Sequence, residues 1–190
     1  LDGDGRSALH FNSNTAWLRV GTDGNEGDIE VQDGDGNRTI HLNGQSGDII
    51  LQNADTAEDF QVCADAAAHA HPGMVMVIDD AMYLRISDRP YDRRVAGVIS
   101  GAGELRPGIV LGRTGGPGTR LPIALNGRTY CLVDADVAPV GVGDLLTTAP
   151  TPGHAMRADD PVQAFGAVIG KALAPLASGQ ALIPILVALQ

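Results

Sequence analysis

The chain has 190 residues, a net charge of −10 at pH 7 and a sequence pI of about 4.7, and it is long enough for one or two domains. The acidic balance disfavours a nucleic-acid partner, because phosphate binding needs a basic face. No apolar run is long enough to predict membrane insertion as a helix. Aromatic residues make up only 4%, 25 Gly and 11 Pro punctuate the chain, and Lys171 is its single lysine. This composition predicts an all-β fold with many turns.

The amino-terminal part of the chain contains a repeat. Gly27–Val31 reads GDIEV and recurs as GDIIL at Gly47–Leu51, 20 residues later, with a related segment at Thr39–Asn43. Apolar pairs begin at positions 9, 18, 29, 40 and 49, and Gly, Asn and Asp fill the links. These spacings of 9 and 11 residues predict a short repetitive β-shaft over residues 1–53. Because the sequence begins at Leu1, inside a repeat, we expect a fragment or a processed product.

Each predicted shaft strand offers two inward apolar positions, at i and i+2, which is too few to bury a core alone. At roughly 25 cal/mol per Å² of buried apolar surface such a sheet is marginal. Two arrangements remedy this: further rungs upstream in a single-chain solenoid, or three chains intertwined as a trimeric β-helix or prism. The thin apolar stripe favours three chains. The expected trimer core is Ile29, Val31, Ile40, Leu42, Ile49 and Leu51.

The repeat ends near Asn53, and residues 54–190 are typical of a compact β-barrel or β-sandwich domain. Residues 53–60 are expected to form an acidic joint. The Asn126–Gly127 dipeptide between two apolar runs predicts a hairpin turn. The final run, Ala181–Leu189, predicts a buried closing strand with Pro184 at a bulge or an edge.

Short Gly-rich motifs follow the shaft in a characteristic order. They are Ala57–Phe60, Pro72–Gly73 before a Met/Val strand, Arg94–Ser100, Pro122–Arg128, Val142–Thr148, Pro152–Met156 and Gly170–Leu173. This order resembles the C-terminal domain of bacteriophage tail-fibre and neck-appendage proteins. It is similar to the intramolecular chaperone domain of the glutamic-type autoproteolytic family. The resemblance covers residues 54–190, and the upstream repeat is similar to the β-fibre shafts that such domains follow.

The resemblance implies a homotrimer that forms the end of a longer fibre chain, in a virion or an extracellular appendage. Its C-terminal domain would trimerise first and set the register of the three shaft strands, which is weakly specified in Gly-rich sequence. We therefore expect a structural protein of the tail-fibre type that takes part in host attachment. Recognition of a cell-surface glycan at the fibre tip is an alternative, although aromatic candidates are few: Trp17, Tyr83, Tyr91 and Tyr130.

Some members of this family cut themselves off, which makes self-cleavage a second alternative. The candidate residues are Asp55, Glu58, Asp59 and Ser100. A carboxylate pair can act as acid and base when burial or a like charge raises one pKa. Because the chain runs through the joint in one piece, we favour a retained cap without enzymatic activity.

No cofactor or metal site is favoured. The run Asp33–Asn37 imitates a Ca²⁺ loop but has Gly44 where the bidentate Glu belongs, so it predicts a turn. His69 and His71 could share one face of a strand as weak metal candidates, and an exposed loop is expected instead. On the shaft, His10 and His41 are expected to point outward into water, with an inward ring of three around an ion as the alternative.

Three further patterns predict structural roles. The sequence contains the residue types of a hydrolytic triad in Ser100, His154 and Asp144, but no nucleophile-elbow motif. We therefore do not expect a catalytic triad. Cys63 and Cys131 are expected to be buried free thiols, with a disulfide left open. The arginines between positions 85 and 128 alternate with Asp and Pro, which favours a solvated or interchain ion-paired surface over an anion site.

Overall fold

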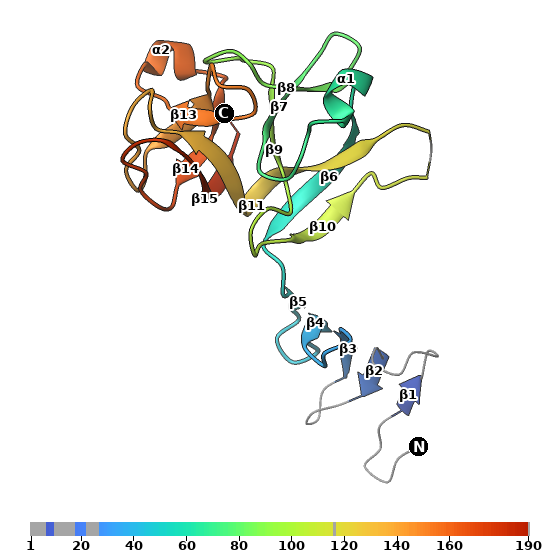
Figure 1. Cartoon of the computed structure of the whole chain (residues 1–190). Coiled ribbons are helices and arrows are strands. Elements are labelled where there is room, and N and C mark those ends of the chain that lie inside the picture. The colour runs from blue at the N-terminus through green and yellow to red at the C-terminus, as the bar shows by residue number, and fades with distance from the viewer. Residues whose placement is uncertain (1–6, 10–17, 22–26, 116, 190) are drawn as a thin grey trace. The chain divides into compact units, whose positions relative to one another are not determined.

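A computed structural model describes residues 7–9, 18–21, 27–115 and 117–189 of the chain. These residues form strands with two short helices, α1 (Ala64–Ala67) and α2 (Pro161–Ala164), which confirms the all-β fold class. The chain divides into two compact units, Leu1–Asn53 and Ala54–Gln190 (Figure 1). The boundary falls where the Gly-Asp-Ile repeat ends.

The first unit is one antiparallel sheet whose strands follow each other in chain order. Its strands are β1 (Ser7–Leu9), β2 (Leu18–Gly21), β3 (Asp28–Gln32), β4 (Arg38–Leu42) and β5 (Ile49–Leu51). The link between β3 and β4 is a turn held by Asp33, whose Oδ1 accepts hydrogen bonds from the backbone N–H groups of Asp35 and Asn37. This side-chain cap explains why Asp and Gly fill the link, and it confirms the predicted turn. All these pairings lie within one chain, so the intertwining of three chains stays a prediction.

The register of this sheet gathers the repeated apolar residues on one face. Directly opposed residues of an antiparallel pair point to the same side. One row runs through positions 31, 40 and 51, and a second through positions 29, 42 and 49. The row between them, at positions 30, 41 and 50, lies on the opposite face and contains Glu30, His41 and Ile50.

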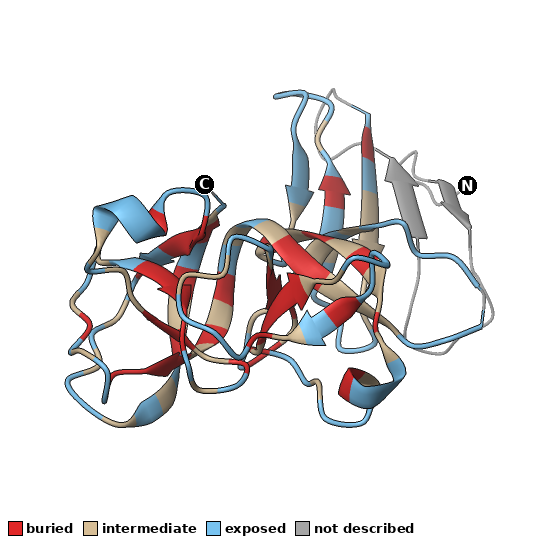
Figure 2. Cartoon of the chain, turned by 90° about the horizontal axis from the view of Figure 1, so that it is seen from above, coloured by how far each residue is buried: buried red, intermediate tan, exposed pale blue. Residues whose placement is uncertain are grey.

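The second unit contains a closed ring of five strands. They are β11 (Arg120–Asp134), β15 (Gln180–Ala188), β14 (Val168–Ala172), β12 (Leu145–Thr148) and β13 (Ala155–Arg157). The ring closes because β13 pairs with β12 on one side and with β11 on the other. Its interior is the larger buried core, which includes Val133, Leu146, Ile169 and Ile185 (Figure 2). The barrel alternative of the predicted domain is therefore the one that forms.

The other strands of this unit build a second core on the amino-terminal half of β11. They are β6 (Asp55–Gln61), β7 (Val75–Ile78), β8 (Leu84–Ile86), β9 (Val95–Ile99) and β10 (Pro107–Leu111). That half of β11 pairs with both β6 and β9, and β7 lies between β9 and β8. Met76, Leu84, Ile99 and Ile123 are the largest fully buried side chains of this core.

The predicted acidic joint is wrong, because residues 55–61 form strand β6. This strand pairs in parallel with β10 and antiparallel with β11. Asp55, Ala57 and Asp59 are buried on alternate positions. The acidic composition suggested a solvated linker, but two of the carboxylates have partners from distant segments that their own sequence does not reveal.

The predicted hairpin at Asn126–Gly127 is also wrong, because β11 runs through this dipeptide without turning. The two apolar runs that flank it pair with other strands instead of with each other. Gly127 has a φ of +95°, and the pairing with β6 is irregular between Ala124 and Asn126. The extra residue opposite β6 is Leu125, which forms a β-bulge, and the positive-φ Gly127 follows this bulge without turning the chain.

The closing strand β15 is confirmed, with Pro184 in its middle, opposite Tyr130 of β11. The carbonyl of Pro184 accepts a hydrogen bond from the N–H of Leu173, just past the end of β14. In an antiparallel strand the N and O of one residue face the same neighbour. The missing N–H of Pro184 therefore faces the end of β14, and no hydrogen bond between β15 and β11 is lost.

Replacing Gly127 with Ala should destabilise the second unit by roughly 2–3 kcal/mol. An ideal Cβ at Gly127 would lie 2.6 Å from the carbonyl oxygen of Ala54 and 2.9 Å from the Cα of Asp55, so backbone must move. Gly101→Ala is the matched control, because Gly101 has a φ of +98° and nothing within 4 Å of its ideal Cβ. Urea unfolding should show the larger loss for Gly127→Ala, and equal losses would contradict the bulge packing.

Candidate functional site

A buried polar pair lies at the start of the second unit. The Oγ of Ser100, just after β9, donates a hydrogen bond of 2.7 Å to the Oδ2 of Asp55, the first residue of β6. The two residues are 2% and 3% exposed. The N–H of Ser100 is held by the carbonyl of Pro122, and the backbone of Gly127 lies against Asp55. Three segments that are far apart in sequence thus fix the pair.

Burial raises the pKa of Asp55 above its ordinary value, and hydrogen bonding from the side chains of Ser100 and Thr129 works in the opposite direction. The Oδ1 of Asp55 is buried, as is the hydroxyl of Thr129. Such an environment favours the neutral carboxyl group. Chemically, a serine hydroxyl beside a carboxyl group is a nucleophile next to a possible base.

The other two acidic candidates are not part of this pair. Asp59 lies four residues along β6, about 13 Å away at the usual rise of a strand. Its Oδ2 accepts a 3.0 Å hydrogen bond from the Nε of Arg113, and its carbonyl accepts one from Arg120. Glu58 is half-buried and points to the other face of β6. No sequence pattern pointed to Arg113, which lies 54 residues away from Asp59.

The structure does not assemble the other catalytic or metal candidates. His69 and His71 are exposed in the loop after α1, which confirms the expected exposed loop and not the alternative place on a strand. Within the described ranges no three His, Cys, Asp or Glu residues are grouped so that they could hold a metal ion. The Nδ1 of His154 contacts the carbonyl of Pro152, and Asp144 accepts from the N–H of Gly141, so neither is paired with Ser100.

The shaft histidine His41 is buried, so its predicted exposure to water is wrong. It is 2% exposed, and its Nε2 lies 3.6 Å from the Oδ1 of Asp28, which also accepts from the N–H of Gly44. The turn after β4 approaches β3 closely here, because an ideal Cβ on Gly44 would lie 2.1 Å from the carbonyl oxygen of Gly27. His10 lies outside the described residues.

Cys131 is buried in the larger core and Cys63 is half-buried, and both are free thiols. Burial raises the pKa of the Cys131 thiol well above its ordinary value, which makes it unreactive. Cys63 borders a shallow apolar depression together with Val62, Ala67 and Tyr83. The sequence expectation of buried free thiols is confirmed for Cys131.

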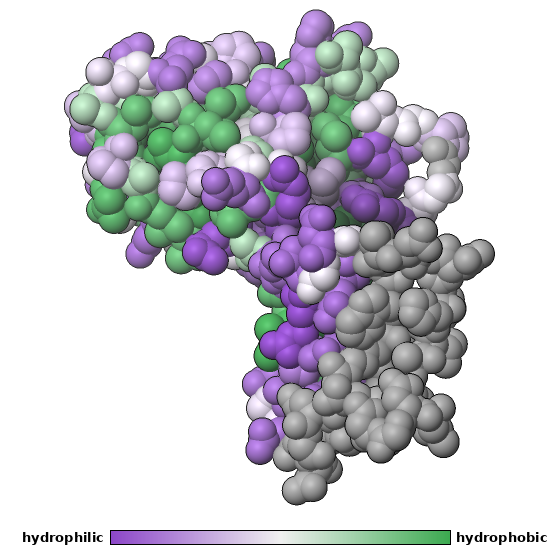
Figure 3. Space-filling model, turned by 60° about the horizontal axis from the view of Figure 1, so that its bottom comes forward, coloured by the Kyte–Doolittle hydropathy of each residue, from purple (hydrophilic) through white to green (hydrophobic). Residues whose placement is uncertain are grey.

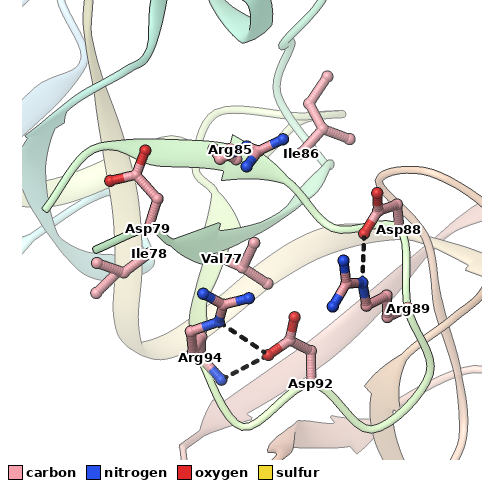
Figure 4. Close-up of a pocket in the computed structure, with 9 residues that line it drawn as sticks. All are labelled: Val77, Ile78, Asp79, Arg85, Ile86, Asp88, Arg89, Asp92 and Arg94. Carbon is pink, nitrogen blue, oxygen red and sulfur yellow. Dashed lines mark hydrogen bonds and ion pairs between the residues drawn. The ribbon is translucent and has the colours of Figure 1, made fainter. Parts of the chain in front are cut away.

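Three of the arginines between positions 85 and 128 line a small cavity of about 40 Å³ between β7, β8 and the segment before β9 (Figure 4). They are Arg85, Arg89 and Arg94. Arg94 lies 3.7 Å from Asp92, and Arg89 lies 3.7 Å from Asp88. Arg85 and Asp79 complete the charged lining, so three guanidinium groups face three carboxylates. This balance matches the predicted ion-paired surface and leaves no excess positive charge for an anion.

The remaining candidate sites are exposed apolar faces, which Figure 3 shows as green areas on the surface. In the first unit Ile29, Ile40, Leu42 and Ile49 are exposed, and Val31 and Leu51 are half-buried. In the second unit the exposed leucines of the ring are Leu145, Leu173, Leu182 and Leu186. The sequence analysis missed these leucines, although the uninterrupted apolar run of β15 was a signal that both its faces are apolar.

The comparisons with known proteins find little. No protein-family model matches the chain, and no curated protein matches it. Among solved structures, the crystal structure of the pre-mature bacteriophage phi29 gene product 12 is similar, with a TM-score of 0.49 and 14% sequence identity. The match covers 80% of this chain and 24% of that one, so this chain spans about a quarter of its length. A likeness at this level shows neither a shared family nor a shared function.

No helix in the described part of the chain is both long and apolar enough to cross a membrane.

Replacing Asp55 with Asn should make the second unit less sensitive to rising pH. Because the folded pKa of Asp55 is raised above 3.8, its contribution to stability is full below the unfolded pKa and is lost as pH rises through the folded pKa. The stability of Asp55→Asn relative to the parent chain should therefore increase between pH 4 and pH 7. Asp80→Asn, which removes the same charge from an exposed side chain, is the control. Parallel pH profiles for parent and Asp55→Asn would contradict a raised pKa.

Proposed function

We propose that this chain is a structural component of a homotrimeric fibre or appendage of the phage-tail type. The observation that carries the proposal is the pair of apolar rows on one face of the first sheet. In this arrangement three copies bring those faces together, and the second unit holds the copies in register. The order of motifs that resembles tail-fibre C-terminal domains supports the same proposal.

The apolar face of the first unit is unsuited to water. Ile49 is 70% exposed, and its neighbours in the same rows, Ile29, Ile40 and Leu42, are also exposed. The opposite face carries polar groups, including an ion pair of 2.8 Å between Arg38 and Glu30. At roughly 25 cal/mol per Å², covering the apolar rows with two further copies supplies the core that one open sheet lacks.

The second unit suits the role of a register clamp. Strands linked by Gly, Asn and Asp specify their pairing register weakly, so three of them aligning unaided would be slow and prone to slip. The second unit has two buried cores of its own and joins the shaft directly at the Asn53–Ala54 boundary. We place the assembly at the end of a longer fibre chain, in a virion or an extracellular appendage.

Replacing Ile40 with Glu should dissociate the trimer. The substitution would bury a charge in each copy, at a cost of roughly 3 kcal/mol or more per chain. Ile50→Glu is the matched control, because Ile50 belongs to the neighbouring strand but its row lies on the opposite face. Light scattering at micromolar concentration should give three times the 19.6 kDa chain mass for the parent and for Ile50→Glu, and less for Ile40→Glu. A parent chain that is monomeric at all concentrations would refute the proposal.

Self-cleavage near the boundary is a second candidate function, favoured by the buried Asp55–Ser100 pair. In this reaction the Oγ of Ser100 attacks a peptide carbonyl carbon while Asp55, in its ionised form, accepts the hydroxyl proton. Asp55 then gives that proton to the leaving amine, and water hydrolyses the resulting ester to release both pieces. Asp55 lies within two residues of the boundary, where such a cut would free the second unit from the first.

Intact mass spectrometry of the full chain after prolonged incubation checks this second candidate. Cleavage should yield two fragments that together account for the whole chain, and Ser100→Ala should abolish them. Ser87→Ala is the control, because Ser87 is equally buried and its hydroxyl has no hydrogen-bond partner among the described residues. An intact parent chain, or cleavage that persists in Ser100→Ala, would exclude Ser100 as the nucleophile.

A further inference from the structure

The geometry of the five-stranded ring points to a second self-association surface. We infer that the outer face of β15, with its neighbours β14, β12 and β11, docks head-to-tail against the next copy of the chain. This inference rests on the proposed homotrimer and names the surface through which its second units meet.

The outer face is built from side chains that the sheet register places in rows. One row crosses four strands and contains Leu145, Lys171, Leu186 and Arg128. A second brings together Leu173, Pro184 and Tyr130, and a third pairs Leu182 with Leu132. An ideal Cβ on Gly73 would lie 2.7 Å from Leu182, so the third row is partly covered by its own chain. The open part of the face therefore centres on Leu145, Leu173 and Leu186.

Strand β15 is apolar on both of its sides. Ile183, Ile185 and Val187 point inward and are buried in the ring. Leu182, Pro184 and Leu186 alternate with them on the outside, where Leu186 is 42% exposed. A strand with one face in water normally alternates apolar with polar residues, whereas a strand covered on both faces is apolar throughout. The composition of β15 is that of a strand whose outer face is covered.

A second copy of this chain is the occupant that the chain itself supplies. Each second unit is joined directly to a shaft unit, so copies whose shafts associate hold their second units near one another. Tethering of this kind gives an effective concentration in the millimolar range. A surface of a few leucines, too small for a stable dimer alone, can be covered under those conditions.

The charges on the face select a head-to-tail contact. Its three rows carry Lys171 and Arg128 and no carboxylate. Two such faces meeting each other would bring these cations together, whereas the rest of the chain, with a net charge of −10 overall, is acidic. A contact between two different surfaces is heterologous, and three copies can close it into a ring.

The experiment compares full-length variants by light scattering over a dilution series. Leu186→Glu should raise the concentration at half-dissociation of the trimer at least tenfold, whereas Val162→Glu should not. Val162 is 77% exposed on α2, outside the rows, and serves as the matched control. Urea unfolding of each variant checks that the ring itself stays folded, since Leu186 points away from the core.

Charge reversal at Lys171 tests the direction of the contact. Lys171→Glu should weaken the assembly several-fold if the partner surface is acidic, and should strengthen it if two identical faces meet beside Arg128. Strengthening, or a Leu186→Glu trimer as tight as the parent, overturns this inference while leaving the proposed trimer standing. A monomeric parent chain overturns the proposed function and this inference together.

Discussion

The pairing of β11 with four other strands is the constraint on which the second unit depends. Its 15 residues cross both buried cores: the amino-terminal half lies between β6 and β9, and the carboxyl-terminal half lies between β15 and β13. A strand of this length can serve two cores only if it changes its pairing partners partway. The bulge at Leu125 and the nearby Gly127 permit that change, because the missing side chain of Gly127 lets the start of β6 approach the backbone of β11.

The buried Asp55–Ser100 pair follows from this arrangement. Strand β6 enters the unit at the bulge, so its first residue is pressed against Gly127 and cannot turn outward to water. A carboxyl group in that position is costly unless it is hydrogen-bonded or neutral, and Ser100 supplies the hydrogen bond. The same geometry makes the pair a structural anchor for the start of β6.

The two units expose apolar surface for different reasons. The first is an open sheet whose repeated residues all fall on one face, so its core is incomplete within a single chain. The second has a filled ring, and its outer leucines are additional to a core that is already buried. In the proposed trimer, copies would meet through both surfaces, so that the first unit would contribute length and the ring alignment.

The sequence alone determined the all-β class, the grouping of the repeated apolar residues on one strand face, the turn at Asp33 and the closing strand, because spacing of apolar residues and turn residues acts locally. It could not determine that Asn126–Gly127 follows a bulge, since a hairpin turn and a bulged strand can both contain a positive-φ glycine and only the strands beside β11 distinguish them. From the sequence, Asp55 and Asp59 were predicted to lie in a solvated joint, because their partners, Ser100 and Arg113, are 45 and 54 residues away. The burial of His41 likewise depends on a turn folding back over β3. Tertiary structure decided these points, because the desolvation of a polar group depends on the residues that pack over it. Those residues come from distant segments, so the sequence next to the polar group does not predict its burial.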